Sequence, residues 1–295
     1  MLADDAVKSL LAGRHNDPFG VLGMHADDSG RLRLRAFLPG AESVQVVEAG
    51  TGKIVCPLPQ CDPAGLFEST IPRRRKRFDY RLLIRWQNGS DTELADAYAF
   101  GPQLHEHDLT LLREGNHPAP YNVLGAQPLR IDGVDGVRFA LWAPNARRVS
   151  VIGSFNQWDG RRHPMRLRHE AGVWEIFIPH VAIGDLYKFE LLDGKGHVLP
   201  SKADPYARAS ELRPGTASRV AGLPTATALP EGRLAANRRD APISIYEVHA
   251  ASWRKGGGGG FPDWQQLADT LPEYAASLGF THIELMPISE HPFDG

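Results

Sequence analysis

The stretch from Val151 to Gly160 reads VIGSFNQWDG, which predicts a short apolar strand that runs into a turn. The turn brings Phe155, Asn156 and Trp158 close together. An indole covers the C–H face of a pyranose ring, and a carboxamide both donates to and accepts from sugar hydroxyls, so this group suits a sugar ligand. The alternative is structural: the two aromatic rings fill the core beneath, while Asn156 and Asp159 shape the turn. The turn alone gives the two interpretations equal weight.

The chain around this turn repeats an arrangement found earlier. Val21-Leu22-Gly23 returns as Val123-Leu124-Gly125, and Ala95-Asp96-Ala97-Tyr98 returns as Ala203-Asp204-Pro205-Tyr206. The offset grows only from 102 residues (Gly23 to Gly125) to 108 (Asp96 to Asp204), as a few loop insertions would produce. Alternating segments with Gly and Pro between them predict antiparallel strands in the first copy, at 32–38, 43–48, 66–71 and 80–86. We therefore predict two tandem immunoglobulin-like β-sandwiches.

The two copies differ at the turn. The first copy has Ala49-Gly50-Thr51-Gly52-Lys53 where the second has its Phe-Asn-x-Trp turn. Only the second copy therefore carries the side chains expected to hold a sugar. The first copy is expected to be a packing or spacing module.

The pattern changes after about residue 240. Ile243–Val248 and Phe280–Pro287 are β-rich runs, and Gly279 suits the position after a helix end. Strand, helix and strand at this spacing predict one βαβ unit with parallel strands and a right-handed crossover. The segment from Pro214 to Asp240, rich in Pro, Ala, Gly and Thr, is expected to be a connection. The helix between the strands presents one apolar face, formed by Trp264, Leu267, Ala268, Leu271, Ala275 and Leu278.

The composition argues against several classes of partner. Of the 295 residues, 42% are hydrophobic and 23% charged, with a formal net charge of −2, so nothing favours nucleic acid or an anionic membrane. The basic run Arg73–Arg77 lies between two strand-like segments and is expected to be a solvated hairpin tip. The acidic start, Met1–Asp5, does not resemble a signal peptide, and no apolar run approaches the roughly 18 residues of a membrane span. The cytoplasm is the expected compartment.

Metal and disulfide chemistry are not expected. Cys56 and Cys61 are the only 2 cysteines, too few for a disulfide framework. A zinc site would need further ligands at suitable spacing, and none is evident. We predict neither a metal nor a cofactor.

The chain resembles a known family. Ile245–His249 reads IYEVH and Leu278–Gly295 reads LGFTHIELMPISEHPFDG, both closely similar to bacterial 1,4-α-glucan (glycogen) branching enzymes. Residues 13–23 resemble the start of their N-terminal domain, and residues 121–206 a family-48 carbohydrate-binding module. From about residue 243 the chain resembles the beginning of the family-13 glycoside hydrolase barrel. The Glu-His-Pro-Phe-Asp-Gly ending is highly specific to these enzymes.

The resemblance implies a mainly β fold, with two tandem immunoglobulin-like β-sandwiches followed by the first β-α-β unit of an incomplete (β/α)8 barrel. The expected domains are an N-terminal sandwich (1–106), a carbohydrate-binding sandwich (107–224), a linker (225–242) and the start of the barrel (243–295). One βαβ unit exposes strand edges and an apolar helix face. Residues beyond about 240 are therefore expected to be poorly ordered or aggregation-prone in isolation.

The chemistry that the resemblance implies is transglycosylation. An aspartate attacks the anomeric carbon of an α-1,4 linkage, a glutamate protonates the leaving oxygen, and a 6-hydroxyl of another segment takes up the glycosyl group, which makes an α-1,6 branch. In the family these residues lie on or after the fourth strand, at the C-terminal ends of the barrel strands. We therefore expect the catalytic residues beyond Gly295, and this chain alone to be inactive. Glu290 and His291 are expected at the rim of the active site. None of the carboxylates near the end is expected to be catalytic: Glu247, Glu284, Glu290 and Asp294.

The sugar contacts carry over in part. Trp158 and Lys188 match the tryptophan and lysine that contact the glucan in glucan-sensing modules, and Phe155 and Asn156 lie in the same turn. Two further contacts of such modules, an aromatic on the next hairpin and a late asparagine, are replaced by Gly196-His197 and by Ser218. One stacked indole contributes a few kcal/mol at most, so we expect millimolar affinity, on the order of 1 mM. The expected partner is an α-1,4-glucan such as glycogen or amylose-like chains, bound by a monomer.

Two other functions compete with a branching enzyme. The chain could be a non-catalytic α-glucan-binding protein, or part of another family-13 enzyme, such as a debranching enzyme or a maltooligosyltrehalose trehalohydrolase. The tandem modules and the ending favour the branching enzyme over these other enzymes. Whether the reading frame continues past Gly295 separates it from the binding protein.

Overall fold

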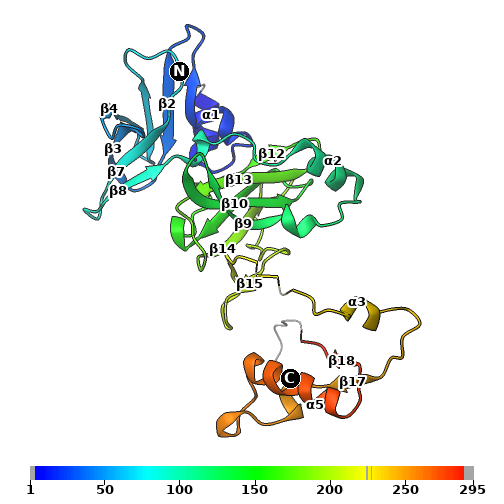
Figure 1. Ribbon diagram of the computed structural model, residues 1–295. Helices are drawn as coiled ribbons and strands as arrows, with labels where there is room; N and C mark the ends of the chain where they lie inside the picture. Colours follow the sequence, from blue (N-terminus) through cyan, green and yellow to red (C-terminus); the bar gives the residue numbers. More distant parts are fainter. Residues whose placement is uncertain (1–3, 224, 227, 289–295) are drawn as a thin grey trace. The chain divides into compact units, whose positions relative to one another are not determined.

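Two β-sandwiches follow one another in the first of the two units into which the chain divides (Figure 1). The computed structural model describes residues 4–223, 225–226 and 228–288. The first unit spans residues 1–223 and the second residues 224–295. Each sandwich consists of two 4-stranded antiparallel sheets, so the predicted mainly β fold with two immunoglobulin-like sandwiches is confirmed.

The first sandwich has the sheet orders β1-β2-β6-β5 and β4-β3-β7-β8. Helix α1 (Asp4–Leu11) precedes it and is followed by a turn at Gly13, whose φ of 62° is the left-handed conformation that glycine adopts without a steric cost. The short helix η1 (Pro18–Gly20) follows. The strands are β1 (Gly23–Ala26), β2 (Leu32–Phe37), β3 (Ala41–Glu48), β4 (Ile54–Leu58), β5 (Gln60–Asp62), β6 (Leu66–Thr70), β7 (Tyr80–Trp86) and β8 (Asp91–Ala95).

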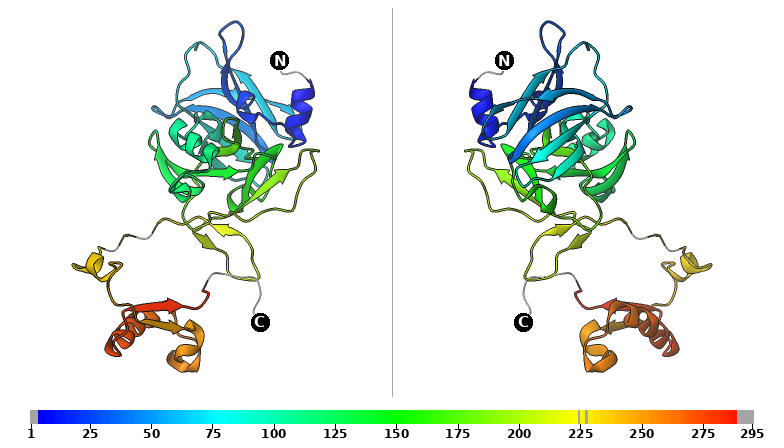
Figure 2. Two further views of the ribbon diagram at one scale, coloured as in Figure 1. Left: turned by 90° about the vertical axis from the view of Figure 1, so that its right-hand side faces the viewer. Right: turned by 90° about the vertical axis from the view of Figure 1, so that its left-hand side faces the viewer.

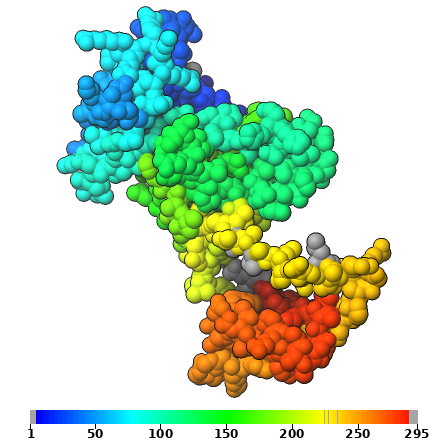
Figure 3. Space-filling view, in the orientation of Figure 1, coloured from blue at the N-terminus to red at the C-terminus, as the bar shows by residue number. Residues whose placement is uncertain are grey.

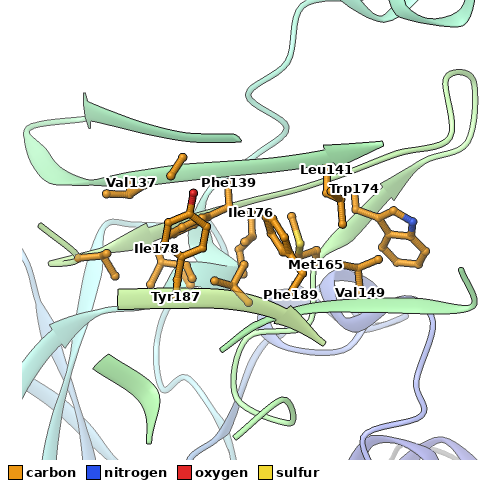
Figure 4. Packing of buried hydrophobic residues seen from close by; sticks show 14 of the residues in the cluster. Val137, Phe139, Leu141, Val149, Met165, Trp174, Ile176, Ile178, Tyr187 and Phe189 are labelled. Atoms are coloured by element: carbon orange, nitrogen blue, oxygen red, sulfur yellow. The ribbon is translucent and has the colours of Figure 1, made fainter. Parts of the chain in front are cut away.

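The second sandwich has the sheet orders β12-β13-β10-β9 and β11-β14-β16-β15. It begins after η2 (Ala97–Ala99), α2 (Glu106–Glu114) and η3 (Pro120–Asn122). Figure 4 shows its core, in which Phe139, Trp174 and Tyr187 lie between the two sheets. Its elements are β9 (Gly125–Ile131), β10 (Val134–Trp142), β11 (Arg148–Gly153), η4 (Ser154–Asn156), β12 (Arg166–Arg168), β13 (Val173–Pro179), β14 (Leu186–Leu192), β15 (Ala209–Ser210) and β16 (Ser218–Arg219).

The predicted repeat is present in three dimensions. In each copy a 3-10 turn that starts with proline leads to a glycine with positive φ, 84° at Gly23 and 82° at Gly125. A Cβ at Gly23 would lie only 2.7 Å from the carbonyl oxygen of Tyr98, and one at Gly125 3.0 Å from that of Tyr206. Both positions therefore require glycine for its conformation and for the close approach.

Two sequence-based expectations are corrected by the sheet topology. Arg73–Arg77 connects β6 to β7, which lie in different sheets, so the basic run is a crossover between sheets and not a hairpin tip. The segment from Pro214 to Asp240 is not all connection. Strand β16 pairs with β14, and Val220 is fully buried in the second core, so its first residues belong to the sandwich.

The second unit contains the predicted βαβ arrangement. Strands β17 (Ile245–Val248) and β18 (His282–Leu285) pair in parallel, and α5 (Trp264–Ser277) joins them (Figure 2). A capping box between Asp263 and Gln266 starts α5. The unit also includes α3 (Arg233–Ala236), which precedes β17, and the short helices α4 (Ala250–Trp253) and η5 (Gly257–Gly259). The described residues therefore include one βαβ unit and no closed barrel.

The apolar face of α5 is only partly covered. Leu267, Leu271 and Ala275 are buried, whereas Trp264 and Leu278 are exposed. No helix in the described parts of the chain is long and apolar enough to cross a bilayer.

Candidate functional site

The Phe-Asn-x-Trp turn is the loop of a hairpin at the edge of the second sandwich. The loop returns along β11, because Val151 N–H donates to the carbonyl of His163 (3.1 Å) and Met165 N–H donates to that of Val149 (2.8 Å). In the first sandwich the matching hairpin joins β3 to β4 through the short turn from Ala49 to Lys53. The extra residues of the second copy therefore lie inside a hairpin that both copies possess.

Asn156 holds the loop from within. Its Oδ1 accepts a hydrogen bond from Gly153 N–H (2.8 Å), while its Nδ2 donates to the carbonyl of Val151 (2.8 Å) and to His163 Nδ1 (2.8 Å). The side chain is only 2% exposed, and both amide hydrogens are used. Asn156 therefore positions the turn, in place of the direct sugar contact predicted for it.

Phe155 also points inward. The residue is half-buried and packs against the second core, with its ring centroid 6.2 Å from that of Phe139 and 6.0 Å from that of His163. Phe155 and Asn156 thus have the structural roles of the alternative interpretation, in which the turn residues fill the core and shape the loop. Trp158 does not.

Trp158 lies on the outside of the loop. Its side chain is 42% exposed, and its indole N–H has no hydrogen-bond acceptor among the residues that the structure describes. Its backbone N–H donates to the carbonyl of Gly153 (3.0 Å), which closes the loop. Gln157 and Trp158 both have a φ of 59°, a left-handed conformation that is uncommon outside glycine and that is often retained at functional sites.

Lys188 lies on the neighbouring strand, next to the start of the loop. On β14 the side chains of Tyr187 and Phe189 enter the core, so Lys188 is on the outer face, in register with Ile152. Its Nζ donates to Thr216 Oγ1 (2.5 Å). Because Trp158 closes on Gly153, whose strand partner is Tyr187, the structure brings Trp158 and Lys188 to the same end of this sheet.

The two positions that depart from glucan-sensing modules are occupied differently. Ser218 is buried, and its Oγ accepts a hydrogen bond from Asp204 N–H (2.8 Å). His197 lies in an exposed turn, where its Nδ1 is 3.2 Å from Asp193 Oδ2. Neither position adds an aromatic face to the site.

Charges fix the outer part of the loop. Arg161 binds Asp159 with Nε–Oδ1 and Nη2–Oδ2 distances of 2.9 and 2.7 Å. Burial alone would raise the pKa of Asp159, but these hydrogen bonds outweigh it and lower the pKa below its ordinary value. Burial lowers the pKa of His163 to about 4, so its ring is neutral at pH 7 and its Nδ1 can accept the hydrogen bond from Asn156.

The sequence reasoning missed His163 and the pairing of Asp159 with Arg161. The only sequence signal was position, since all three residues follow the tryptophan closely. The predicted rim residues Glu290 and His291 lie outside the described residues. Among those that are described, no group of three or more His, Cys, Asp or Glu side chains could hold a metal ion.

Two family models match the chain. Residues 3–98 match the model described as alpha-1,4-glucan branching enzyme GlgB, N-terminal domain, and residues 123–207 match carbohydrate-binding module 48 (isoamylase N-terminal domain). These regions coincide with the two sandwiches, and the predicted resemblance is confirmed for them.

The chain is similar to parts of several larger proteins of known structure. A putative alpha amylase from Salmonella typhimurium is 26% identical over 57% of this chain and 25% of its own, with a TM-score of 0.40. Ligand-free PulA from Klebsiella pneumoniae is 19% identical over 92% of this chain and 29% of its own, with a TM-score of 0.45. The GBS pullulanase SAP in complex with maltotetraose is 16% identical over 89% of this chain and 35% of its own, with a TM-score of 0.43.

The chain thus spans between 25% and 35% of the length of these three proteins. Its own assignment comes from the two family models. Residues 3–98 belong to the family of GlgB alpha-1,4-glucan branching enzyme N-terminal domains, and residues 123–207 belong to carbohydrate-binding module 48.

Proposed function

We propose that this chain is the N-terminal, glucan-binding part of a 1,4-α-glucan branching enzyme, which transfers an α-1,4-glucan segment to a 6-hydroxyl and so forms α-1,6 branches. The observation that carries this proposal is the order of the two matched modules, a GlgB N-terminal domain followed by carbohydrate-binding module 48. The proposal includes the domain division 1–106, 107–224, 225–242 and 243–295, a monomeric state and a cytoplasmic location.

The proposed sugar site consists of Trp158 and Lys188. The exposed indole offers a flat apolar surface that covers one face of a glucose ring, and the ammonium offers hydrogen-bond donors to hydroxyls at the ring edge. Phe155 and Asn156 support the turn from inside. The ligand class is an α-1,4-glucan, such as glycogen or amylose-like chains.

Catalysis is proposed to require residues other than those described. The retaining mechanism needs two carboxylates about 5 Å apart on either side of the scissile bond. Glu247 and Glu284 are strand partners on β17 and β18, but the family resemblance gives neither a catalytic role. Glu290 and His291 are proposed to lie at the rim of the active site. The 295-residue chain is therefore proposed to bind glucan without branching it.

Affinity electrophoresis through gels containing glycogen tests the binding part of this proposal. Wild-type protein is expected to be retarded, and Trp158→Ala is expected to migrate as in a gel without glycogen. Trp142→Ala is the matched control, because Trp142 is also exposed, at 58%, but lies on β10 in the other sheet. Retardation that survives Trp158→Ala and disappears with Trp142→Ala would contradict the proposed site.

Incubation with amylose tests the catalytic part. The purified chain is expected to leave the iodine absorption of amylose unchanged and to release no reducing ends. A loss of iodine absorption without new reducing ends would mean that this chain branches glucan by itself. New reducing ends released from a glucan with α-1,6 linkages would point to a debranching enzyme instead.

A further inference from the structure

Arg162, which follows the sugar-binding turn, joins the two sandwiches. Its Nη2 donates to the carbonyl of Pro39, in the loop after β2 of the first sandwich. The same guanidinium lies over the ring of Trp86 at the end of β7, 5.5 Å from the ring centroid. Nη2 also contacts Gln157 Oε1 (3.3 Å), on the residue immediately before Trp158. One side chain therefore touches the first sandwich and the sugar-binding loop at once.

Other contacts join the two sandwiches next to the loop. Tyr98 Oη lies 3.3 Å from the carbonyl oxygens of both Arg162 and Pro164. Arg166 lies over the ring of Phe19, 3.8 Å from its centroid. The space-filling view shows the first sandwich (blue to cyan) in contact with the second (green) (Figure 3). The returning strand of the loop thus lies where the two sandwiches meet.

The loop needs such a restraint. Gln157 and Trp158 occupy the left-handed region, which is unfavourable for non-glycine residues and persists only when surrounding contacts hold it. Asn156 restrains the loop from the inside, as described above. On the outside, Arg161 holds Asp159, and Arg162 holds Gln157. Of these outer contacts, the one through Arg162 extends into the first sandwich.

We propose that the first sandwich positions the glucan-binding turn of the second, and that Arg162 is the residue through which it does so. This inference rests on the proposed function, because Trp158 and Lys188 are the groups that touch the glucan. Arg162 is a positioning residue: it fixes Gln157, and Gln157 fixes the backbone from which the indole of Trp158 projects. The first copy lost or never had a sugar-binding turn, and in this proposal it acts on the turn of its neighbour.

Three variants separate positioning from general destabilisation. Arg162→Ala removes the contacts with Pro39, Trp86 and Gln157. Arg162→Lys keeps the positive charge but loses the planar guanidinium, which donates to both Pro39 and Gln157 and stacks on the ring of Trp86. Arg162→Lys is therefore expected to restore part of what Arg162→Ala loses. Arg166→Ala is the matched control. Arg166 also bridges the sandwiches, through Phe19 and the carbonyl of Phe100, but forms no hydrogen bond, ion pair or ring contact with Gln157 or Trp158.

The first readout needs no glucan. The chain has 6 tryptophans, and their indole N–H resonances can be observed in a ¹H–¹⁵N spectrum, with that of Trp158 assigned from a Trp158→Phe variant. Arg162→Ala is expected to shift or broaden the Trp158 resonance, and Arg166→Ala to leave it in place. An unchanged Trp158 resonance in Arg162→Ala would overturn the proposal, whether or not the protein binds glucan.

The second readout is affinity for maltoheptaose, measured by titration at matched fractions of folded protein. Coupling free energies between sites commonly correspond to factors of roughly 5 to 150, and we expect Arg162→Ala to weaken binding by about fivefold. Arg162→Lys should weaken it less, and Arg166→Ala by less than twofold. Equal losses in Arg162→Ala and Arg166→Ala would overturn the proposal. If wild-type protein fails to bind while Trp158 still responds to Arg162→Ala, the proposed function fails and the positioning role stands.

Discussion

Tyr80 donates to Asp96 in the first sandwich at 2.6 Å, and Tyr187 donates to Asp204 in the second at the same distance. In each copy the aspartate also accepts from the backbone N–H two residues later, on Tyr98 or Tyr206. These shared contacts show that the copies keep one scaffold. They differ in a hairpin, where the first copy has a short turn and the second has a loop that carries an exposed tryptophan.

The features that the two copies share are those that the sandwich needs to fold. The feature that only the second copy has is the one that we propose for binding glucan. The buried Tyr–Asp pair and the positive-φ glycines recur because the scaffold requires them. The loop of the second copy instead has left-handed residues and an indole N–H that donates to none of the described residues, and neither feature improves packing. In the proposed function, the sugar contacts lie in this hairpin loop, where extra residues disturb the core least.

The largest loss of stability is expected from Asn156→Ala. The change leaves Gly153 N–H, the carbonyl of Val151 and the His163 ring without their partner inside the loop, which should cost about 3 kcal/mol at roughly 1 kcal/mol per lost hydrogen bond. Urea unfolding measures it. Asn145→Ala, at an exposed asparagine of the same sandwich, should cost less than about 0.5 kcal/mol. A loss below about 1 kcal/mol for Asn156→Ala would mean that the amide does not hold the loop.

The shared scaffold predicts equal effects in the two copies. Tyr80→Phe and Tyr187→Phe each remove a donor from a buried carboxylate and should each destabilise the protein by about 2 kcal/mol. Burial raises the pKa of Asp96 and of Asp204, although the tyrosine hydrogen bonds lower it, so loss of either tyrosine should raise the corresponding pKa further. Thermal unfolding and carboxyl titration by NMR measure both. A cost confined to one copy would show that the pairs are not equivalent.

Acid should weaken the second sandwich through His163. Its pKa is lowered to about 4 in the folded protein, against an ordinary value of 6.5, so the unfolded chain binds a proton first as the pH falls. The contribution of His163 to the free energy of unfolding is therefore fully present above about pH 6.5 and decreases as the pH falls towards 4. At pH 5.5 the loss should be about 1 kcal/mol, since one pKa unit corresponds to about 1.4 kcal/mol.

His163→Gln is the control for this pH dependence, because its side chain does not titrate in that range. The variant should be less sensitive to pH between 6.5 and 4.5 than the wild-type protein. Identical pH profiles of stability for the two proteins would contradict the lowered pKa of His163.

The smallest effect is expected in the first hairpin. Lys53→Ala, in the exposed turn that corresponds to the proposed sugar-binding loop, should change stability by less than about 0.5 kcal/mol and leave retardation in glycogen gels unchanged. Any clear loss of retardation would mean that the first copy also contacts glucan, and the contrast between the copies would fail.

Much of the scaffold could be predicted from sequence because its signals are local. The return of Val21-Leu22-Gly23 as Val123-Leu124-Gly125 and the alternating segments of the first copy predicted two sandwiches with one plan, and the structure contains both. The predicted hairpin tip at Arg73–Arg77 was wrong because the sequence of a connection does not reveal which sheet its next strand joins.

The site was predicted less completely. A carboxamide has the same hydrogen-bonding groups whether it faces a sugar or a backbone, and only burial shows that Asn156 faces inward. Arg162 was missed because its partner Pro39 is 123 residues away in sequence, and no local pattern records that contact. Trp158 was selected through the family resemblance, because the turn alone gave the sugar-contact and structural interpretations equal weight.

The most direct test of the central claim is an NMR titration of the whole chain with maltoheptaose, observing the 6 tryptophan indoles and the backbone amides. We predict that the Trp158 indole shifts most, that the Lys188 amide shifts with it, and that the Trp142 indole does not move. A spectrum in which Trp142 or residues of the first hairpin respond to saturating maltoheptaose, while Trp158 and Lys188 stay in place, would contradict the account.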